Sequence, residues 1–201
     1  PFEMGPDVTA YAHSKFESEL QVWRGQEEGL NVLTVNPTII LGEGDFDRSS
    51  SALFAMVYKG LKWHPTGSNG FVSAKDVAKA SVLLADHGCW GQRFLLNSEN
   101  RSYQSIFNQM AQEFRTPKPT RPLRPWMMGA AWRLSAIWEY VTGKKAKATK
   151  ESVANTHMHH SYETNRLEKT LLGHGMDWKY QPINETIQEV SKAFLEQQGV
   201  R

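Results

Sequence analysis

The segment "NVLTVNPTIILG", residues 31–42, constrains the fold of this 201-residue chain more than any other feature. It is dense in β-branched residues and shows little alternation of apolar and polar side chains, which is typical of a strand buried on both faces. Pro37 marks an interruption or the end of this strand, because proline has no N–H to donate to a sheet. Strands of this kind form parallel sheets covered by helices, so the segment predicts an α/β fold.

Helical patterns surround this segment. From Thr9 to Glu28, apolar residues fall at spacings of three and four, which predicts an amphipathic helix that ends at Gly29. The serines Ser49–Ser51 suit the N-cap of a following helix, and Asn184 suits the cap of a closing one. Asp76 suits a cap or a packing position rather than a catalyst. The sequence pattern also predicts a second strand at 92–98. It predicts further helices at 51–61, 74–86, 102–114, 125–141 and 184–199.

The composition is that of an ordinary globular protein, with 23 Lys and Arg against 21 Asp and Glu, and 40% apolar residues. The prolines of residues 115–125 suggest a linker. Residues 115–150 contain nine basic residues and one acidic residue, Glu139. Nucleic-acid binding is not favoured, because these basic residues are scattered. In the same region, tryptophans at helical spacing suit packing against another layer: Trp126, Trp132 and Trp138.

Metal, disulfide and membrane chemistry are not predicted. Adjacent residues of an extended segment point to opposite faces, so His157, His159 and His160 do not suggest a metal site. The single cysteine, Cys89, excludes an intrachain disulfide and suits a buried apolar position. One cysteine and the lack of a long apolar run favour a cytoplasmic protein with no membrane partner.

Tyr11 and Lys15 stand four residues apart on the first predicted helix, so they project from the same side. A lysine ammonium beside a phenol favours the phenolate, which makes a tyrosine a usable acid or base near neutral pH. The spacing alone is a weak signal, because Tyr58 and Lys62 share it, as do Tyr140 and Lys144. Only the first pair lies early in a long helix that leads into a buried strand.

Three motifs in order resemble a known family: "YAHSKFESEL", "LNVLTVNPTIILGEGD" and "GFVSAKDVAKASVLLAD". They look like the second half of an extended short-chain dehydrogenase/reductase of the NAD-dependent epimerase/dehydratase group. The tail, residues 159–190, resembles dihydroflavonol-reductase-like and 3β-hydroxysteroid-dehydrogenase-like members. The resemblance implies the C-terminal part of a doubly wound, Rossmann-type parallel sheet in residues 1–114, with a smaller, mostly helical substrate lobe and closing helix in residues 115–201.

The resemblance also implies roles for particular residues. Tyr11 would be the general acid/base at a substrate carbonyl or alcohol, and Lys15 would support it and hold the ribose of NAD or NADP. The end of the strand would lie beside the nicotinamide. Ser50 is a further candidate for cofactor binding, through a phosphate at the start of its helix. The expected cofactor-binding residues are thus Tyr11, Lys15, Pro37, Thr38, Ile39, Ile40 and Ser50.

The family's Gly-rich phosphate loop, its NAD/NADP-selecting residue and its carbonyl-polarising Ser or Thr lie upstream of the matched tyrosine and are absent here. We therefore expect that an N-terminal half is missing and that this fragment alone is inactive. The function expected is an NAD(P)-dependent oxidoreductase acting on a small apolar or aromatic substrate. The alternatives are a sugar-nucleotide epimerase or dehydratase and a non-catalytic dinucleotide-binding regulator. Helix pairing of the kind seen in the family would give a homodimer.

Overall fold

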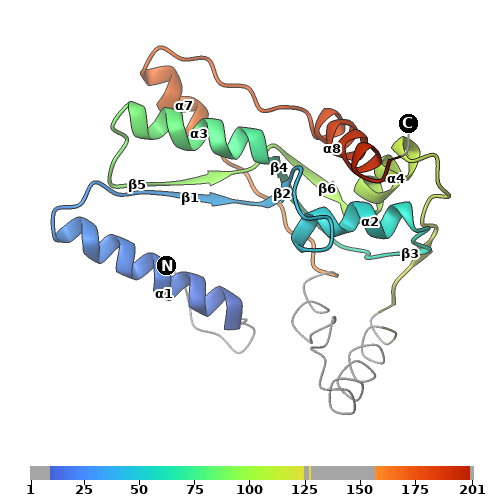
Figure 1. Cartoon of the computed structure of the whole chain (residues 1–201). Coiled ribbons are helices and arrows are strands. Elements are labelled where there is room, and N and C mark those ends of the chain that lie inside the picture. Colours follow the sequence, from blue (N-terminus) through green and yellow to red (C-terminus); the bar gives the residue numbers. More distant parts are fainter. Residues whose placement is uncertain (1–9, 125–126, 128–156, 200–201) are drawn as a thin grey trace.

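The computed structural model describes residues 10–124, 127 and 157–199. Figure 1 shows their arrangement, with helices on both sides of a strand layer. The helices are α1 (Ala10–Glu27), η1 (Ser49–Ser51), α2 (Ala52–Tyr58), α3 (Ala74–Asp86), α4 (Tyr103–Glu113), α7 (Arg166–Gly173) and α8 (Ile183–Gln197). The strands are β1 (Leu33–Pro37), β2 (Ile39–Leu41), β3 (Trp63–His64), β4 (Ser68–Ser73), β5 (Gln92–Leu96), β6 (Glu99–Ser102) and β7 (Arg121–Pro122).

Strands β1 and β5 form a parallel pair whose register runs from Leu33 opposite Gln92 to Pro37 opposite Leu96. Helices α3 and α7 lie on one side of this pair and α1 lies on the other (Figure 1). This layering of helices around parallel strands confirms the predicted α/β fold. The side chains of β1 are only partly buried.

The predicted strand of residues 31–42 is two strands. Pro37 ends β1, and Thr38 separates it from β2. Strand β2 pairs in parallel with β4, and β4 pairs antiparallel with β6. The chain therefore passes from one sheet to another at Pro37–Thr38, where proline removes a donor from the ladder. The expectation that Pro37 interrupts or ends the strand is confirmed.

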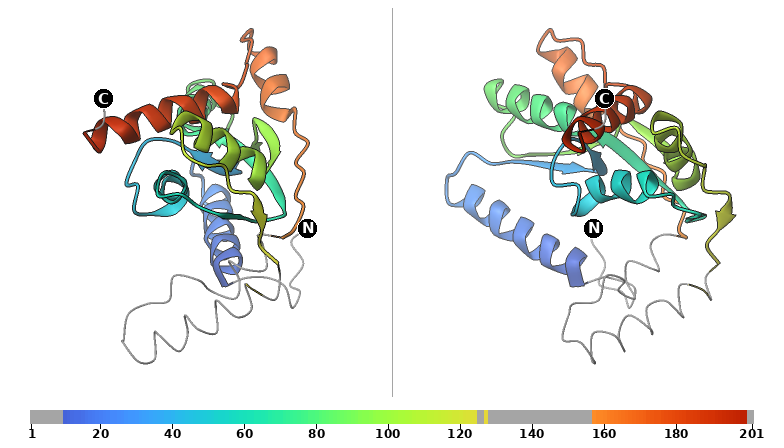
Figure 2. Two further views of the ribbon diagram at one scale, coloured as in Figure 1. Left: turned by 90° about the vertical axis from the view of Figure 1, so that its right-hand side faces the viewer. Right: turned by 45° about the vertical axis from the view of Figure 1, so that its right-hand side comes forward.

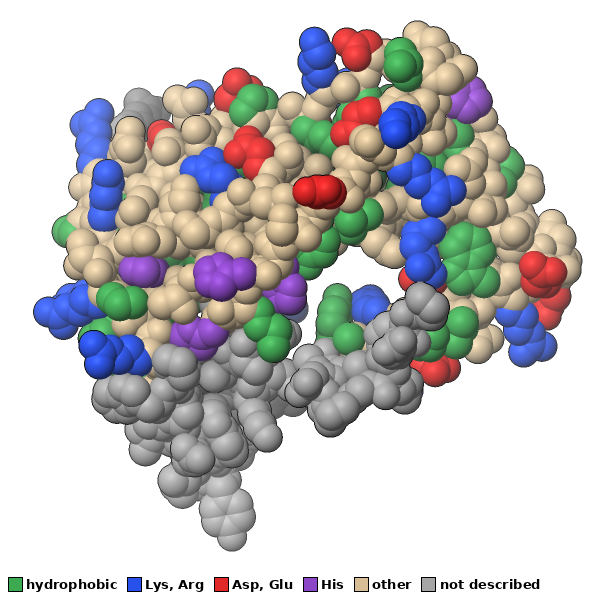
Figure 3. Space-filling view, turned by 180° about the vertical axis from the view of Figure 1, so that it is seen from behind, with side chains coloured by type: hydrophobic (Ala, Val, Ile, Leu, Met, Phe, Trp, Pro, Cys, Tyr) green, Lys and Arg blue, Asp and Glu red, His purple; other side chains and the backbone are tan. Residues whose placement is uncertain are grey.

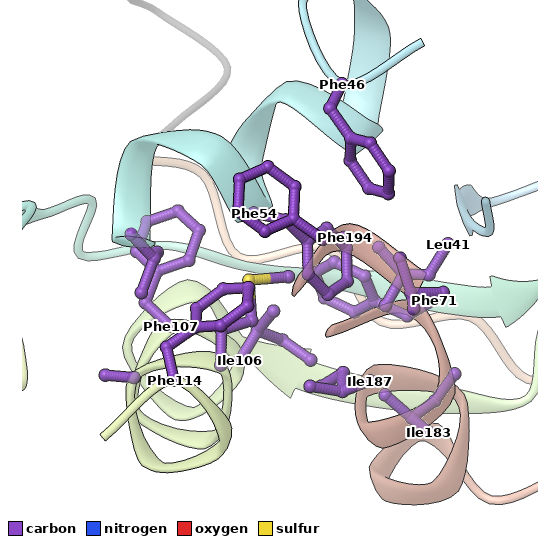
Figure 4. Close-up of a cluster of buried hydrophobic side chains, with 14 residues drawn as sticks. Leu41, Phe46, Phe54, Phe71, Ile106, Phe107, Phe114, Ile183, Ile187 and Phe194 are labelled. Carbon is purple, nitrogen blue, oxygen red and sulfur yellow. The ribbon is translucent and has the colours of Figure 1, made fainter. Parts of the chain in front are cut away.

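Two hydrophobic clusters hold these layers together. One lies between the β2–β4–β6 sheet and helices α2, α4 and α8, and Figure 4 shows its aromatic side chains packed edge to face. The two views of Figure 2 show α8 beside α4 at this place. The other cluster lies where α3 and α7 cover β1 and β5, and it contains the buried Cys89, as predicted. Both clusters combine residues from before and after position 115, so the predicted domain boundary stays a prediction.

Two predicted helix caps are wrong. The side chain of Ser51 makes no capping bond to α2, and Ser49–Ser51 form a short 3-10 turn. Helix α8 begins at Ile183 after Pro182, so Asn184 lies in its first turn, where its Oδ1 accepts from Arg101. The amphipathic helices α3, α4 and α8 are confirmed, each with one buried face. Helix α1 is confirmed as a helix that ends just before Gly29 at φ +100°, but its predicted apolar packing face is not, because α1 has no buried residue and Leu20 is exposed.

Several predictions fall on residues outside the described parts of the chain. They concern the helix predicted at 125–141 with its three tryptophans, the pair Tyr140 and Lys144, and the basic residues from Arg133 to Lys150.

Candidate functional site

A groove of about 650 Å³ lies between α1 and the carboxyl end of β1. All seven residues predicted to bind a cofactor line it, although they come from three separate stretches of the chain. A space-filling view from behind shows the molecule hollowed between the part that carries α1 and the rest (Figure 3). In open α/β sheets, ligands bind at the carboxyl ends of parallel strands, and this groove has that position.

Tyr11 and Lys15 lie on the first turns of α1, at the end of the helix that borders the groove. The Nζ atom of Lys15 lies 5.6 Å from the centroid of the Tyr11 ring. The Tyr11 side chain is 70% exposed, so its hydroxyl is open to a ligand. The helical spacing of four therefore brings the two side chains together, as predicted.

Polar contacts near its middle hold α1 against the sheet. The Glu19 carboxylate forms an ion pair with Arg93 of β5. It also accepts a hydrogen bond of 3.1 Å from the indole N–H of Trp23. The guanidinium of Arg93 lies over the Trp23 ring, 5.9 Å from its centroid. Since α1 has no buried residue, these contacts anchor the helix that carries Tyr11.

Thr38 lies at the bend between β1 and β2, on the groove wall. Its N–H donates to the carbonyl of Leu96 at 3.0 Å, which continues the β1–β5 pairing by one residue. Its hydroxyl lies 3.3 Å from the same carbonyl and 3.2 Å from Oδ1 of Asn97. These contacts fix the backbone that follows Pro37, so this part of the groove has a defined shape.

Ser50 lies at the groove because of hydrogen bonds that the sequence did not predict. Its hydroxyl donates to the carbonyl of Ile40 in β2, and the hydroxyl of Ser51 donates to the carbonyl of Gly42 at 3.2 Å. The 3-10 turn is therefore tied back onto β2. Ser50 lines the groove from the side of this turn rather than as a helix cap.

The second Tyr-x-x-x-Lys pair has a structural role. Tyr58 ends α2 and its ring packs edge to face on Phe114 and Phe194, with centroids 5.4 and 5.1 Å away. Lys62 follows the helix and is exposed. Tyr58 thus belongs to the hydrophobic cluster of Figure 4 and not to the groove.

Six further residues line the groove that the sequence reading did not single out: Ser18, Glu19, Val22, Thr34, Val35 and Asn36. The first three follow Tyr11 and Lys15 at helical spacing, so the same helix face could have been extended to include them. The other three precede Pro37 on β1. Asn97 and Gly70, which lie behind Thr38, had no signal in the sequence.

The histidine-containing segment lies along the start of β4. Ser68 forms an isolated parallel bridge with His159. The hydroxyl of Thr66 lies 2.8 Å from Nδ1 of His157, and that of Ser68 lies 3.2 Å from Nδ1 of His159. Within the described residues, no group of three or more His, Cys, Asp or Glu side chains is arranged to hold a metal. These histidines are paired with hydroxyl groups in the structure.

Burial raises the pKa of three side chains outside the groove: Asp76, Tyr162 and Tyr180. The backbone N–H of Gln181 donates a hydrogen bond of 2.9 Å to the Asp76 carboxyl, which acts against the rise in its pKa. Asp76 therefore joins α3 to the segment before α8, in agreement with the predicted packing role.

The chain is similar to known proteins over part of their length. No family model matches the chain. The chain is 29% identical over 130 residues to sterol demethylase protein B of Methylococcus capsulatus, covering 64% of this chain and 39% of that protein. It is 28% identical over 108 residues to tetraketide alpha-pyrone reductase 2 of Arabidopsis thaliana, covering 52% of this chain and 34% of that protein.

Solved structures share the fold over nearly the whole chain. A nucleoside-diphosphate-sugar epimerase from Pseudomonas aeruginosa matches with a TM-score of 0.73 at 18% identity, over 98% of this chain and 59% of that one. The yeast methylglyoxal/isovaleraldehyde reductase, complexed with NADPH, matches with a TM-score of 0.61 at 21% identity, over 94% and 52%. The chain thus spans less than half the length of these curated relatives and little more than half of these structures. Among the described residues, no helix is long and apolar enough to cross a membrane.

Proposed function

We propose that this chain, which is similar in sequence and fold to the extended short-chain dehydrogenases/reductases, forms the part of an NAD(P)-dependent oxidoreductase that contributes the Tyr and Lys of the active site. The observation that supports the proposal is the common groove. Residues that the family resemblance assigns to the dyad and the strand end line it, together with Ser50. The reaction proposed is the reduction of a carbonyl, or the oxidation of an alcohol, on a small apolar or aromatic substrate.

The groove suits a nicotinamide nucleotide chemically. The residues that line the groove include the apolar Val35, Pro37, Ile39 and Ile40, and an apolar wall suits a planar ring. The ammonium of Lys15, together with the polar groups of Asn36 and Thr38, offers partners for ribose hydroxyls and an amide. The cofactor, when bound, would supply the hydride in reduction and accept it in oxidation, and the proton transfer would belong to protein groups.

In the proposed mechanism, Tyr11 moves the proton. In the direction of reduction, its hydroxyl gives a proton to the substrate oxygen as the carbonyl carbon becomes tetrahedral; in oxidation, the phenolate takes the proton of the alcohol. Lys15, with its ammonium beside the Tyr11 ring, stabilises the phenolate and binds the ribose. Glu19, Trp23 and Arg93 keep α1, and with it both side chains, at the groove.

The Tyr11→Phe variant tests the proposal in the protein that contains this chain. We expect turnover to fall by about two orders of magnitude or more, because a general acid/base contributes roughly 10²–10⁴-fold, while the dissociation constant for NAD(P)H stays within about threefold of wild type. Stopped-flow absorbance at 340 nm measures turnover, and cofactor fluorescence measures binding. Tyr58→Phe is the matched control, because it removes the same hydroxyl from outside the groove. Full turnover in Tyr11→Phe contradicts the assignment.

A sugar-nucleotide epimerase or dehydratase is the second candidate, because the epimerase from Pseudomonas aeruginosa has the same fold. Both activities use the same dyad, so the Tyr11 variant does not separate them. A panel of aromatic ketones and nucleoside-diphosphate sugars does. Net oxidation or reduction of the cofactor supports the oxidoreductase, and conversion of the sugar nucleotide without net redox change supports the alternative. Cofactor binding without turnover of any substrate supports a regulator. A homodimer stays a prediction, and multi-angle light scattering measures it.

A further inference from the structure

Asn97 lies directly behind the groove, at the carboxyl end of β5. It is buried and does not line the groove itself. Its Oδ1 lies 3.2 Å from the hydroxyl of Thr38, which does line the groove. Its Nδ2 lies 3.3 Å from the carbonyl of Tyr162 and 3.4 Å from Oδ1 of Asn100. One buried amide therefore uses its acceptor toward the groove and its donors away from it.

Asn100 completes the connection to Tyr162. Its Nδ2 donates to the carbonyl of Tyr162 at 2.9 Å, and its Oδ1 accepts from the N–H of Tyr162 at 3.0 Å. The side-chain amide of Asn100 thus bonds to both backbone groups of Tyr162, as a neighbouring strand would. Residues 157–162 are therefore held at both ends, by Ser68 through the bridge to His159 and by the two asparagines at Tyr162.

Gly70 shows how closely these groups pack. A Cβ atom at this position would lie 2.2 Å from Oδ1 of Asn97, 2.7 Å from Cγ2 of Thr38 and 2.8 Å from Cδ2 of Tyr162. All three groups thus meet at one point over the backbone of β4. Because the packing is this close on the side of β4, an Asn97 side chain displaced in that direction moves its neighbours as well.

We propose that Asn97 is a positioning residue for the groove: it fixes Thr38, and hence the backbone after Pro37, and it couples this wall to the segment 157–162. The inference rests on the proposed function, because it assigns Asn97 to the support of that site. Residues 157–162 lie within residues 115–201, the part of the chain predicted to form the substrate lobe and closing helix. The network therefore links the proposed cofactor wall to the predicted substrate lobe.

The chemistry of the network requires an amide at position 97. Aspartate would place a carboxylate against the carbonyl of Tyr162 and Oδ1 of Asn100, which are both acceptors. Alanine would leave the hydroxyl of Thr38 with the carbonyl of Leu96 as its partner and would leave a small void. The alanine variant removes the side-chain acceptor of the Thr38 hydroxyl, whereas the aspartate variant keeps that acceptor but repels the carbonyl of Tyr162 and Oδ1 of Asn100, which displaces the side chain that Thr38 contacts.

The first test compares Asn97→Ala and Asn97→Asp with Asn165→Ala in the protein that contains this chain. Asn165 is a matched control, since it is exposed, lines the same polar hollow as Asn97 and makes no side-chain cap at the start of α7. We expect kcat/KM to fall by about ten- to a hundredfold in both Asn97 variants, because small misplacements at an active site cost rates of this order. The control stays within about twofold of wild type.

The second test separates positioning from general loss of stability. Thr38→Val removes the hydroxyl from the other side of the contact, so a double-mutant cycle with Asn97→Ala isolates the Thr38–Asn97 interaction. We expect the double variant to lose no more kcat/KM than the worse single variant. Losses that multiply at the two sites contradict the positioning role, since they mean that the residues act independently.

The third test does not depend on activity. Hydrogen exchange followed by mass spectrometry or NMR reports the protection of the Thr38 and Tyr162 amides. We expect both amides to exchange at least about tenfold faster in Asn97→Ala than in wild type, and no change in Asn165→Ala. Unchanged protection overturns the inference. A wild-type protein that binds no NAD(P)H overturns the proposed function instead, and the exchange result then still decides whether Asn97 holds the two segments together.

Discussion

The Cβ that any other residue would place at Gly70 meets Oδ1 of Asn97 at 2.2 Å, so the close approach of β4 to the end of β5 depends on a missing side chain. The nearest atoms also include Thr38 and Tyr162, so the clash cannot be relieved at one flexible side chain. Glycine is needed here for close packing and not for an unusual backbone angle. The three segments that meet at this point define the back of the candidate site.

We predict that Gly70→Ala lowers the free energy of unfolding by about 1–3 kcal/mol, the usual cost of forcing an extra methyl group into a packed interior. Gly173→Ala is the control, because nothing lies within 4 Å of a Cβ at that position. Urea denaturation followed by circular dichroism measures both. Equal free energies of unfolding for the two variants would mean that the structure relieves the clash at position 70 without cost.

The aromatic cluster of Figure 4 is expected to dominate stability. Phe54 is fully buried, with ring centroids 6.4 Å from those of Phe46 and Phe114. Phe54→Ala should lower the free energy of unfolding by about 3–5 kcal/mol through lost burial and the cavity that remains. Met56→Ala, on the exposed side of the same helix, should change it by less than about 1 kcal/mol. Thermal and urea denaturation test this difference, and similar values for the two variants would contradict the assignment of the core.

Lys15 is predicted to act on both binding and turnover. Lys15→Met keeps the length and apolar stem of the side chain and removes the ammonium that lies over Tyr11. We expect NAD(P)H affinity to fall by about tenfold, because a charged hydrogen bond is worth about 1.5–3 kcal/mol, and turnover to fall as well. Lys62→Met is the control, because it removes the same charge from the structural Tyr-x-x-x-Lys pair. Fluorescence titration of both variants decides the matter, and an undiminished affinity in Lys15→Met would rule out a ribose contact.

The Asp76 carboxyl gives a pH prediction. Burial raises its pKa above the usual 3.8, so the folded state binds this proton more tightly than the unfolded state. Stability from this group is therefore fully present below pH 3.8 and is lost as the pH rises through the raised folded value. Asp76→Asn keeps an oxygen acceptor for the N–H of Gln181 and does not titrate.

We expect Asp76→Asn to be at least as stable as wild type at pH 7 and to lose this advantage as the pH approaches 4. Asp76→Ala should be less stable than wild type by about 1–3 kcal/mol at either pH, because it leaves the buried N–H of Gln181 without its acceptor. Urea denaturation of the three proteins at both pH values provides the measurement. An advantage of Asp76→Asn that grows on acidification would show that the pKa is lowered by folding instead.

Much of the local structure follows from short-range patterns. Helical spacing predicted α1, α3 and α4, and β-branched residues before Pro37 predicted β1, because these elements depend on neighbours within one or two turns. Helix starts were less predictable. Ser50 and Ser51 before α2 bond to the carbonyls of Ile40 in β2 and of Gly42 just after it, so the local capping pattern did not decide their role.

The sequence by itself determined the type of fold and the place of the Tyr11 and Lys15 pair on a helix that precedes a parallel strand. Spacing alone did not distinguish this pair from Tyr58 and Lys62; the position of Tyr11 and Lys15 early in a helix that leads into a strand favoured them. The tertiary structure added the physical difference, by placing Tyr58 among Phe114 and Phe194 and Tyr11 at the mouth of a groove. Asn97 likewise became visible only through Thr38 and Tyr162, which lie 59 and 65 residues away along the chain. Such contacts arise from the packing of distant segments, and no local pattern of residue types encodes them.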